Sequence, residues 1–312
     1  MKKIGSLVLL VVLVLTVGAC SSKEEKLDKL VITYVTSPLN VPSIIENQNN
    51  ILQDNFKANG TTVELAKIVS GADQTQALAS GDVQILNCVG ATSVVLAADK
   101  DNDIKIIKMY ARSPKAFMII AKDKNINSPQ DLKGLKIGGP VGTNLHELLA
   151  AYLNMGNIEL SDVNFMNMDL PSAKAALANG SIDVALLAGP DAYQVLKQGY
   201  HLVSDGQGLI SAQTYLATTQ DFYDNHKQAI DTFLNSQQQA LAFMKEKPDE
   251  TINIVAKDLD LPSTDVKAMI KQYNFNPEIT SNDLEGLQKT ADFMYQAKMI
   301  DKKIDVNDLI IK

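Results

Sequence analysis

Two segments of the chain carry nearly the same order of apolar and polar positions. Residues 77–85 read Ala-Leu-Ala-Ser-Gly-Asp-Val-Gln-Ile and lead to Gly90, while residues 176–184 read Ala-Leu-Ala-Asn-Gly-Ser-Ile-Asp-Val and lead to Gly189. Each is typical of a helix end, a glycine stop and a short apolar strand that runs into a glycine-bearing loop. The repeat predicts two similar α/β lobes that face each other. Because such folds place a ligand beyond the carboxyl ends of their strands, we expect a crevice between the lobes.

The rest of the hydrophobic pattern alternates between strand and helix periods, which is the signature of an α/β sheet. We expect strands at 30–35, 62–68, 104–110, 117–121, 136–140 and 163–168, and helices at 43–55, from Ser70, from Asn144 and, punctuated by prolines, after Asp221. A first passage between lobes is placed at 111–115. This assigns residues 29–115 and 218–312 to lobe 1 and residues 116–217 to lobe 2.

The first twenty residues predict export. Lys2 and Lys3 precede an uncharged apolar stretch at 4–17, which has the length of a secretory signal rather than of a membrane span. The stretch ends in Val-Gly-Ala-Cys, which resembles the lipobox of bacterial lipoproteins and implies lipidation at Cys20; an ordinary signal peptide with a chance cysteine is the alternative. Residues 21–28 follow as a hydrophilic tether. We expect the mature protein on the extracytoplasmic face of a membrane, held there by lipid.

Charge and cysteine content narrow the function classes. The formal net charge of −7 becomes about −9 when the signal with its two lysines is removed, which argues against a nucleic-acid partner. Once Cys20 is acylated, Cys88 has no partner for an internal disulfide, and its apolar surroundings favour a packed thiol over a nucleophile. We expect a monomer.

Five short segments together resemble a known family. They are Ala-Lys-Asp at 121–123, Ser-Pro-Gln-Asp-Leu-Lys-Gly-Leu-Lys-Ile-Gly at 128–138, Gly-Thr at 142–143, Ala-Ala-Leu at 175–177 and Gly-Ser-Ile-Asp at 180–183. Between about residues 30 and 300, the chain is similar to the solute-binding proteins of ABC importers in the nitrate, sulfonate, taurine and thiamine-precursor group. Many relatives carry a tryptophan before the proline of the segment 188–191, and this chain contains none, which leaves the ligand open.

The resemblance implies a type II periplasmic-binding-protein fold, with two α/β lobes joined by two crossovers and a ligand cleft between them. It implies that the lobes close on a small molecule and present it to the permease and ATPase subunits of an importer. A sulfonate, taurine or nitrate is the expected ligand, and a pyrimidine that is a thiamine precursor is the alternative within the same fold.

The residues themselves indicate an anion site at helix entrances. Asn144 is the expected cap of a helix, with Glu147 as its capping-box partner. Similar entrances follow strands at residues 70–71 and 90–93, and free amides there can hold an anionic head group. Glycine-rich turns that only need unusual dihedral angles are the competing interpretation. The candidate ligand-binding residues are Thr36, Ser37, Pro38, Asn40, Ser70, Gly71, Asn87, Gly90, Thr92, Arg112, Gly142, Thr143, Asn144, His146, Gly189 and Asp191.

Arg112 is the only arginine of the chain and falls at the first predicted passage between the lobes. Its planar guanidinium could clamp a carboxylate, a sulfonate or a phosphate in two parallel hydrogen bonds. Pairing with a surface acid is the alternative. Among the aromatic residues, Tyr34, Phe117 and Tyr193 are expected either to wall an apolar part of the ligand or to belong to the core.

The sequence offers little support for catalysis. It has no zinc-ligand spacing, no phosphate-cradling Walker loop and no nucleophile elbow, so we expect no catalytic residues, no metal and no cofactor. Because some enzymes share the two-lobed architecture, an exported enzyme on the same scaffold is kept as an alternative, and a surface adhesion protein is a third.

Overall fold

The computed structural model describes residues 27–35 and 37–311 of the chain. The strands are β1 (Lys29–Thr33), β2 (Thr62–Ala66), β3 (Leu86–Gly90), β4 (Lys105–Arg112), β5 (Phe117–Ala121), β6 (Lys136–Gly139), β7 (Asn164–Asn167), β8 (Val184–Ala188), β9 (His201–Asp205) and β10 (Gln213–Thr218). The α-helices are α1 (Val41–Gln48), α2 (Ile51–Lys57), α3 (Gly71–Ser80), α4 (Ala91–Asp99), α5 (Asn144–Met155), α6 (Leu170–Asn179), α7 (Gly189–Lys197), α8 (Gln220–Asn225), α9 (Lys227–Glu246), α10 (Pro248–Asp258), α11 (Ser263–Met269) and α12 (Ser281–Gln296). Short 3-10 turns are η1 (Pro114–Ala116), η2 (Pro129–Leu132), η3 (Leu160–Asp162), η4 (Ile270–Gln272) and η5 (Val306–Leu309).

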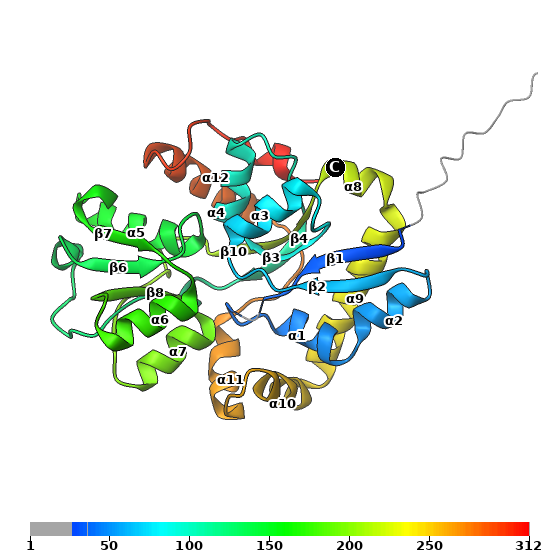
Figure 1. The fold of residues 1–312 in the computed structure, drawn as a ribbon, viewed down its shortest axis with the longest axis horizontal. Helices are drawn as coiled ribbons and strands as arrows, with labels where there is room; N and C mark the ends of the chain where they lie inside the picture. The colour runs from blue at the N-terminus through cyan, green and yellow to red at the C-terminus, as the bar shows by residue number, and fades with distance from the viewer. Residues whose placement is uncertain (1–26, 36, 312) are drawn as a thin grey trace, which may run out of the picture.

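The strands form two α/β lobes that lie side by side (Figure 1). Lobe 1 contains the parallel pair β1 and β2 and the antiparallel sheet β3-β10-β4. A hydrogen bond from the Thr33 amide to the Ile85 carbonyl, 3.0 Å long, joins the pair to the start of β3. Lobe 2 is built on the five-stranded sheet β7-β6-β8-β5-β9, with α5, α6 and α7 around it.

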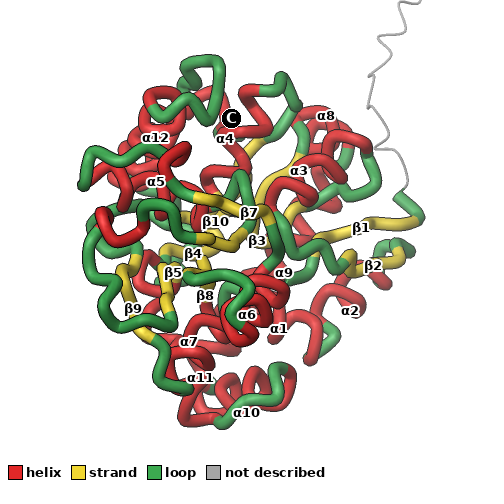
Figure 2. The backbone as a smooth tube through the Cα atoms, turned by 60° about the vertical axis from the view of Figure 1, so that its left-hand side comes forward, coloured by secondary structure: helices red, strands yellow, loops and turns green. Residues whose placement is uncertain are grey.

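The strand β5 shows why the central strands of lobe 2 are apolar throughout. Phe117, Ile119 and Ala121 face the cluster that includes α5, while Met118 and Ile120 face the opposite cluster, which includes α6 and α7. Successive side chains of a strand point to opposite faces, so a strand covered by helices on both sides needs an unbroken apolar run. Figure 2 shows the same layering, with the strands inside and the helices around them.

The chain crosses between the lobes twice. It leaves lobe 1 after β4, through η1, and returns between β9 and β10. The boundary expected at 217/218 falls inside β10, whose hydrogen-bonded neighbours are the lobe 1 strands β3 and β4. We therefore assign β10 to lobe 1. The helices that follow pack back onto lobe 1, with α9 against α1 and α2 and α12 against α4.

One predicted helix is divided in the structure. The expected helix at 43–55 is two helices, α1 and α2, separated at Asn49 and Asn50. Asn50 has a φ of 54°, the left-handed conformation, which asparagine adopts more readily than most residues and which interrupts the helical ladder. The predicted strand at 62–68 is also shorter, since β2 ends at Ala66.

Within the described residues, none of the helices combines the length and the apolar character needed to cross a membrane. Cys20 and the predicted signal and tether up to residue 26 lie outside those residues.

Candidate functional site

A cavity lies between the two lobes at the carboxyl ends of several strands. Its empty volume is about 620 Å³, which includes its opening to solvent. Lobe 1 contributes the ends of β1 and β3 and the start of α3, and lobe 2 contributes the starts of α5, α6 and α7. Of the residues predicted from the sequence, those that line the cavity are Ser37, Pro38, Ser70, Gly71, Gly90, Thr143 and Asn144.

Five helices begin at this cavity, and their N-cap residues are part of its wall. These residues are Ser70 of α3, Gly90 of α4, Thr143 of α5, Asp169 of α6 and Ala188 of α7. The side chains of Ser70 and Asp169 cap their own helices, whereas the N-cap residues of α4, α5 and α7 form no side-chain cap bond. Because the first N–H groups of a helix have no partner within it, these helix ends offer hydrogen-bond donors and a partial positive charge.

The side-chain hydroxyls of the wall are mostly committed as donors. Ser37, Ser93, Thr143 and Thr214 each donate to a main-chain carbonyl, at Ala188 (3.2 Å), Gly142 (2.8 Å), Pro140 (2.9 Å) and Ala111 (3.3 Å) respectively. The donors that remain for a ligand are therefore chiefly main-chain amides. The bonds of Ser37 and Ser93 also run from lobe 1 to lobe 2, so they hold the two walls against each other.

The cavity wall carries no cationic side chain among the residues that the structure describes. Asp169 is the single charged residue of that part of the wall, and one of its carboxylate oxygens accepts the Ser172 amide at 2.8 Å. An anion in the cavity would thus be held by helix ends and amides, as happens where phosphate or sulfate sits on a helix N-terminus.

The remaining wall is apolar, and the sequence analysis missed most of it. Of the aromatic candidates, Phe117 lies in the wall, beside aliphatic residues of both lobes: Val35, Val69, Leu145 and Leu170. Val69 is 59% exposed at the cavity, although a large aliphatic side chain is normally buried. The sequence signal that could have identified this apolar wall is the valine directly before the helix entrance at Ser70. An apolar residue in a loop is not expected to pack in the core, so it is a candidate for contact with a ligand.

Asn144 does not cap α5, contrary to the sequence prediction. The cap position belongs to Thr143, and the Asn144 carboxamide instead accepts from the Thr92 amide (3.3 Å) and hydroxyl (3.0 Å) and donates to the Gln213 carbonyl (3.0 Å). Glu147 is likewise not a capping-box partner, since it is buried against lobe 1. Partners from the other lobe thus replace the local bonds that the sequence suggested.

Other candidates support the cavity without lining it. Asn40 donates to the Val35 carbonyl at 2.8 Å, Asn87 donates to Glu46 at 3.1 Å, and Thr92 belongs to the Asn144 network. Gly142 lies against the Leu96 side chain of lobe 1, and Gly189 lies against the main chain of lobe 1 at Pro38 and Leu39. Asp191 is paired with Lys174 at 3.1 Å, and Thr36 lies outside the described residues.

His146 is also absent from the cavity wall. Its ring stacks on Phe165 with the ring centroids 4.9 Å apart, and its Nδ1 accepts the Gly142 amide at 3.3 Å. Burial lowers the pKa of His146 to about 4, so the ring is neutral at physiological pH. Cys88 lines the cavity, but burial raises the pKa of its thiol to about 12, which leaves no thiolate to act as a nucleophile.

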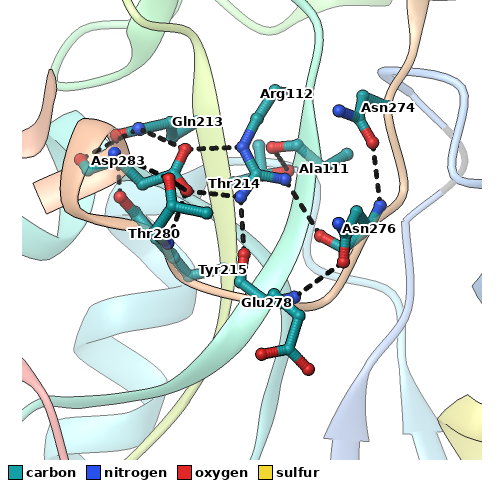
Figure 3. A network of polar contacts seen from close by, with 10 residues as sticks. All are labelled: Ala111, Arg112, Gln213, Thr214, Tyr215, Asn274, Asn276, Glu278, Thr280 and Asp283. Atoms are coloured by element: carbon teal, nitrogen blue, oxygen red, sulfur yellow. Dashed lines mark hydrogen bonds and ion pairs between the residues drawn. The ribbon is translucent and has the colours of Figure 1, made fainter.

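Arg112 is bonded within lobe 1 rather than to the cavity (Figure 3). Its Nε and Nη2 contact the two carboxylate oxygens of Asp283 at 2.5 and 2.6 Å, and Nη1 and Nη2 donate to the carbonyls of Asn276 (2.9 Å) and Glu278 (2.6 Å). Burial works against ionisation of Asp283, but hydrogen bonds from Arg112 and Thr280 outweigh it and hold its pKa well below the usual range. Four of the five guanidinium N–H groups are thus bonded within lobe 1, and the anion-clamp interpretation does not fit this geometry.

Replacement of Arg112 by Lys should therefore affect stability and not binding. Lysine keeps the charge but cannot form the two-pronged contact with Asp283 while also bonding two carbonyls, so we expect a loss of about 1 to 2 kcal/mol in the free energy of unfolding. Urea unfolding measures the loss, and calorimetry on a ligand that binds the native protein should give an unchanged Kd. A tenfold weaker Kd with unchanged stability would restore the clamp interpretation.

The fold and the sequence both have known relatives. Residues 53–251 match the family described as NMT1/THI5 like. The chain is 28% identical over 321 residues to a putative aliphatic sulfonates-binding protein of Bacillus subtilis (strain 168), covering 99% of this chain and 95% of that protein. It is 30% identical over 240 residues to the taurine-binding periplasmic protein of Escherichia coli (strain K12), covering 74% of each. Among solved structures, the alkanesulfonate-binding protein SsuA from Xanthomonas axonopodis pv. citri, bound to MOPS, superposes with a TM-score of 0.83 at 19% identity and covers 92% of this chain and 99% of that one.

Proposed function

The chain belongs to the NMT1/THI5-like family, and from this premise we propose that it is the extracytoplasmic solute-binding component of an ABC importer, with a small sulfonate as its ligand. The observation that carries the proposal is the meeting of helix N-termini from both lobes, α4 on one side and α5 and α7 on the other, whose N-cap residues form no side-chain cap bond, at one cavity whose described wall holds no cationic side chain. The names of two relatives, a putative aliphatic sulfonates-binding protein and a taurine-binding periplasmic protein, point the same way.

The chemistry of a sulfonate suits this wall. A sulfonate is a strong-acid anion whose three oxygens only accept hydrogen bonds. The wall offers main-chain amides, while four of its hydroxyl protons, those of Ser37, Ser93, Thr143 and Thr214, are already used. The carbon chain of the ligand would lie against Phe117, Val69 and Leu170. The described part of the wall has Phe117 as its single aromatic ring, which disfavours the alternative ligand, a pyrimidine, because a pyrimidine is best held by stacking.

Binding would favour the closed arrangement of the lobes. A ligand shifts such an equilibrium only by its differential affinity for the two states, and amides from both lobes can contact one anion only when the lobes are close. The closed form is what a permease and its ATPase would recognise. Lipidation at Cys20 would keep the protein at the membrane. A binding role also agrees with the buried, uncharged thiol of Cys88, which argues against an exported enzyme.

Thermal unfolding with candidate ligands tests this function. We expect an alkanesulfonate, present at 100 times its Kd, to add about 2.7 kcal/mol of stability, which shifts Tm upward by several degrees. The matched carboxylate of the same chain length, taurine, nitrate and an aminopyrimidine complete the set. Small-angle scattering should show compaction with the stabilising ligand. Stabilisation by the pyrimidine alone would assign the alternative ligand, turnover of a bound compound would assign an enzyme, and no response to any of the set would remove the proposal.

A further inference from the structure

A buried polar network crosses from lobe 2 to lobe 1 beside the cavity. The Thr92 hydroxyl on α4 lies 3.0 Å from Asn144 Oδ1 and 2.8 Å from Glu147 Oε2, both on α5. The other carboxylate oxygen, Glu147 Oε1, lies 2.8 Å from the Thr290 hydroxyl on α12. Each of these four side chains belongs to a residue that is at most 3% exposed, so the network is shielded from bulk solvent.

Main-chain groups fix the orientation of the Asn144 carboxamide. Its Oδ1 accepts the Thr92 amide proton at 3.3 Å, and its Nδ2 donates to the Gln213 carbonyl at 3.0 Å. An amide N–H can only donate and a carbonyl can only accept, so the carboxamide cannot be turned around without losing both bonds. Asn144 Oδ1 therefore faces the Thr92 hydroxyl as an acceptor.

If Glu147 is ionised, the network has one proton too few to make every contact a hydrogen bond. The Thr92 hydroxyl has a single proton but lies within bonding distance of two acceptors, Asn144 Oδ1 and Glu147 Oε2. If Glu147 is a neutral acid, it donates to Thr92, and Thr92 donates to Asn144. Thr290 then donates to Glu147 Oε1 and accepts from Ser211, whose hydroxyl is 3.2 Å away. Each contact is then a hydrogen bond with one proton.

This inference rests on the proposed function and names the regulation of the same site. We propose that Glu147 is a positioning residue that, as a neutral carboxylic acid, aligns the N-termini of α4 and α5 at the cavity, so that closure of the lobes on an anion takes up one proton. Glu147 acts through Thr92, the second residue of α4, and Asn144, the first residue of α5, which lie in the first turns that follow the N-caps Gly90 and Thr143. When the lobes separate, the carboxyl meets water and ionises.

The charges around Glu147 do not stabilise its ionised form. Burial raises the pKa of Glu147 and the hydroxyls of Thr290 and Thr92 lower it, with a net rise. Among the described residues, no lysine or arginine forms an ion pair with it. The charged and titratable groups on its own and the neighbouring elements are His146 and Tyr152 on α5, Asp99 on α4, Tyr215 on β10, Lys105, Lys108, Tyr110 and Arg112 on β4, and Asp283, Glu285, Lys289, Asp292 and Tyr295 on α12. Arg112 is paired with Asp283, and Asp99 bonds Lys100 and the amides of Asp301 and Lys302.

The direction of the pH effect on ligand affinity follows from how tightly Glu147 holds its proton in the open and the closed arrangement of the lobes. The closed state holds the proton on Glu147 more tightly than the open state, so affinity is highest below the ordinary pKa of a glutamate. It falls as the pH rises through the window between that value and the raised value of the closed state. One proton gives a slope of at most about tenfold in Kd per pH unit.

Calorimetry with hexanesulfonate between pH 4 and pH 9 tests the proposal, since this probe stays ionised throughout. The wild-type Kd should rise with pH in that window. Glu147→Gln should bind as tightly as wild type at the acid end and show no such slope, because a carboxamide donates to Thr92 and accepts from Thr290 as the neutral acid does. The matched control is Glu285→Gln, which changes an exposed glutamate on α12 and should keep the wild-type slope.

Equal slopes for wild type and Glu147→Gln would overturn the proposal, as would a Glu147→Gln protein that binds tenfold more weakly at every pH. If hexanesulfonate binds none of the proteins, the proposed ligand fails, and urea unfolding without ligand decides the state of Glu147. A neutral Glu147 predicts that Glu147→Gln gains stability over wild type as the pH rises, while parallel pH profiles would show that it is ionised in the native protein.

Discussion

Replacement of Glu46 by Gln is expected to raise the free energy of unfolding above pH 8 by up to about 5 kcal/mol. Glu46 is fully buried on α1 inside lobe 1. Its Oε2 accepts from Asn87 at 3.1 Å and from Gln237 at 3.0 Å, whereas its Oε1 has no hydrogen-bond partner among the residues that the structure describes. Glutamine keeps the accepting oxygen and removes the ionisable group, so the two existing bonds survive the substitution.

The pH dependence of this stability difference identifies the ionisation of the buried Glu46 carboxyl as its cause. Burial raises the pKa of Glu46 from 4.5 to about 8 against the opposing bond from Asn87. Below pH 4.5 the carboxyl is neutral in both the folded and the unfolded chain, and the two proteins should be similarly stable. Between pH 4.5 and 8 the unfolded chain has lost the proton that the folded protein retains, so wild-type stability falls by up to about 1.4 kcal/mol per pH unit. Above pH 8 the full cost of the buried charge is present.

Urea unfolding of wild type and Glu46→Gln from pH 4 to pH 9 measures this difference. Glu285→Gln is again the control for loss of a negative charge, because Glu285 is exposed. Parallel profiles for wild type and Glu46→Gln would mean that water reaches Glu46 in the native protein. A loss of stability at every pH would mean that the carboxamide cannot replace the acid in its bonds with Asn87 and Gln237.

Local chemistry explains why much of the fold was predictable. The strand β5 was predicted with its observed bounds, because an apolar run covered on both faces ends where the first polar residues appear. The start of α3 was predicted because the Ser70 hydroxyl caps the helix with a bond three residues away, to the Asp73 amide. The break between α1 and α2 was missed, since an asparagine in the left-handed conformation is compatible with helix on either side.

Distant partners explain what was missed at the site. Asn144 and Glu147 have the spacing of a capping box, but their actual partners include Thr92 on α4 and Thr290 on α12, far away in the sequence. Arg112 was predicted as an anion clamp because its partner Asp283 lies 171 residues away in the sequence, where no local pattern reveals the ion pair. The helix entrances were found because glycine and serine after a strand are a local signal, whereas the apolar wall depends on which loops the fold brings together.

Replacement of Gly189 by Ala is expected to weaken ligand binding by roughly 10- to 100-fold, or about 1.4 to 2.8 kcal/mol. Gly189 begins α7 in lobe 2 and faces the main chain of lobe 1. A Cβ placed on it would lie 2.8 Å from the Leu39 amide nitrogen and 3.1 Å from Pro38 Cα. Both atoms belong to the backbone, so no side chain can rotate away, and the lobes must separate to make room.

The same contact includes the bond from the Ser37 hydroxyl to the Ala188 carbonyl, which separation of the lobes would lengthen beyond 3.2 Å. The amide donors of α7 would then withdraw from an anion held by α4, while the binding groups themselves are unchanged. Scattering should show a more open molecule that the ligand no longer compacts.

The control for this substitution is Gly180→Ala. Gly180 has a φ of 77° and Gly189 a φ of 53°, so a side chain at either position meets the same left-handed backbone, at a cost of about 1 to 2 kcal/mol of stability. A Cβ on Gly180 would have no atom within 4 Å from the described residues beyond its own chain neighbours, which leaves the contact between the lobes as the difference. Calorimetry with the alkanesulfonate should therefore find near-native affinity for Gly180→Ala and the large loss for Gly189→Ala. Equal affinities would show that the protein binds its ligand without bringing Gly189 against Pro38 and Leu39.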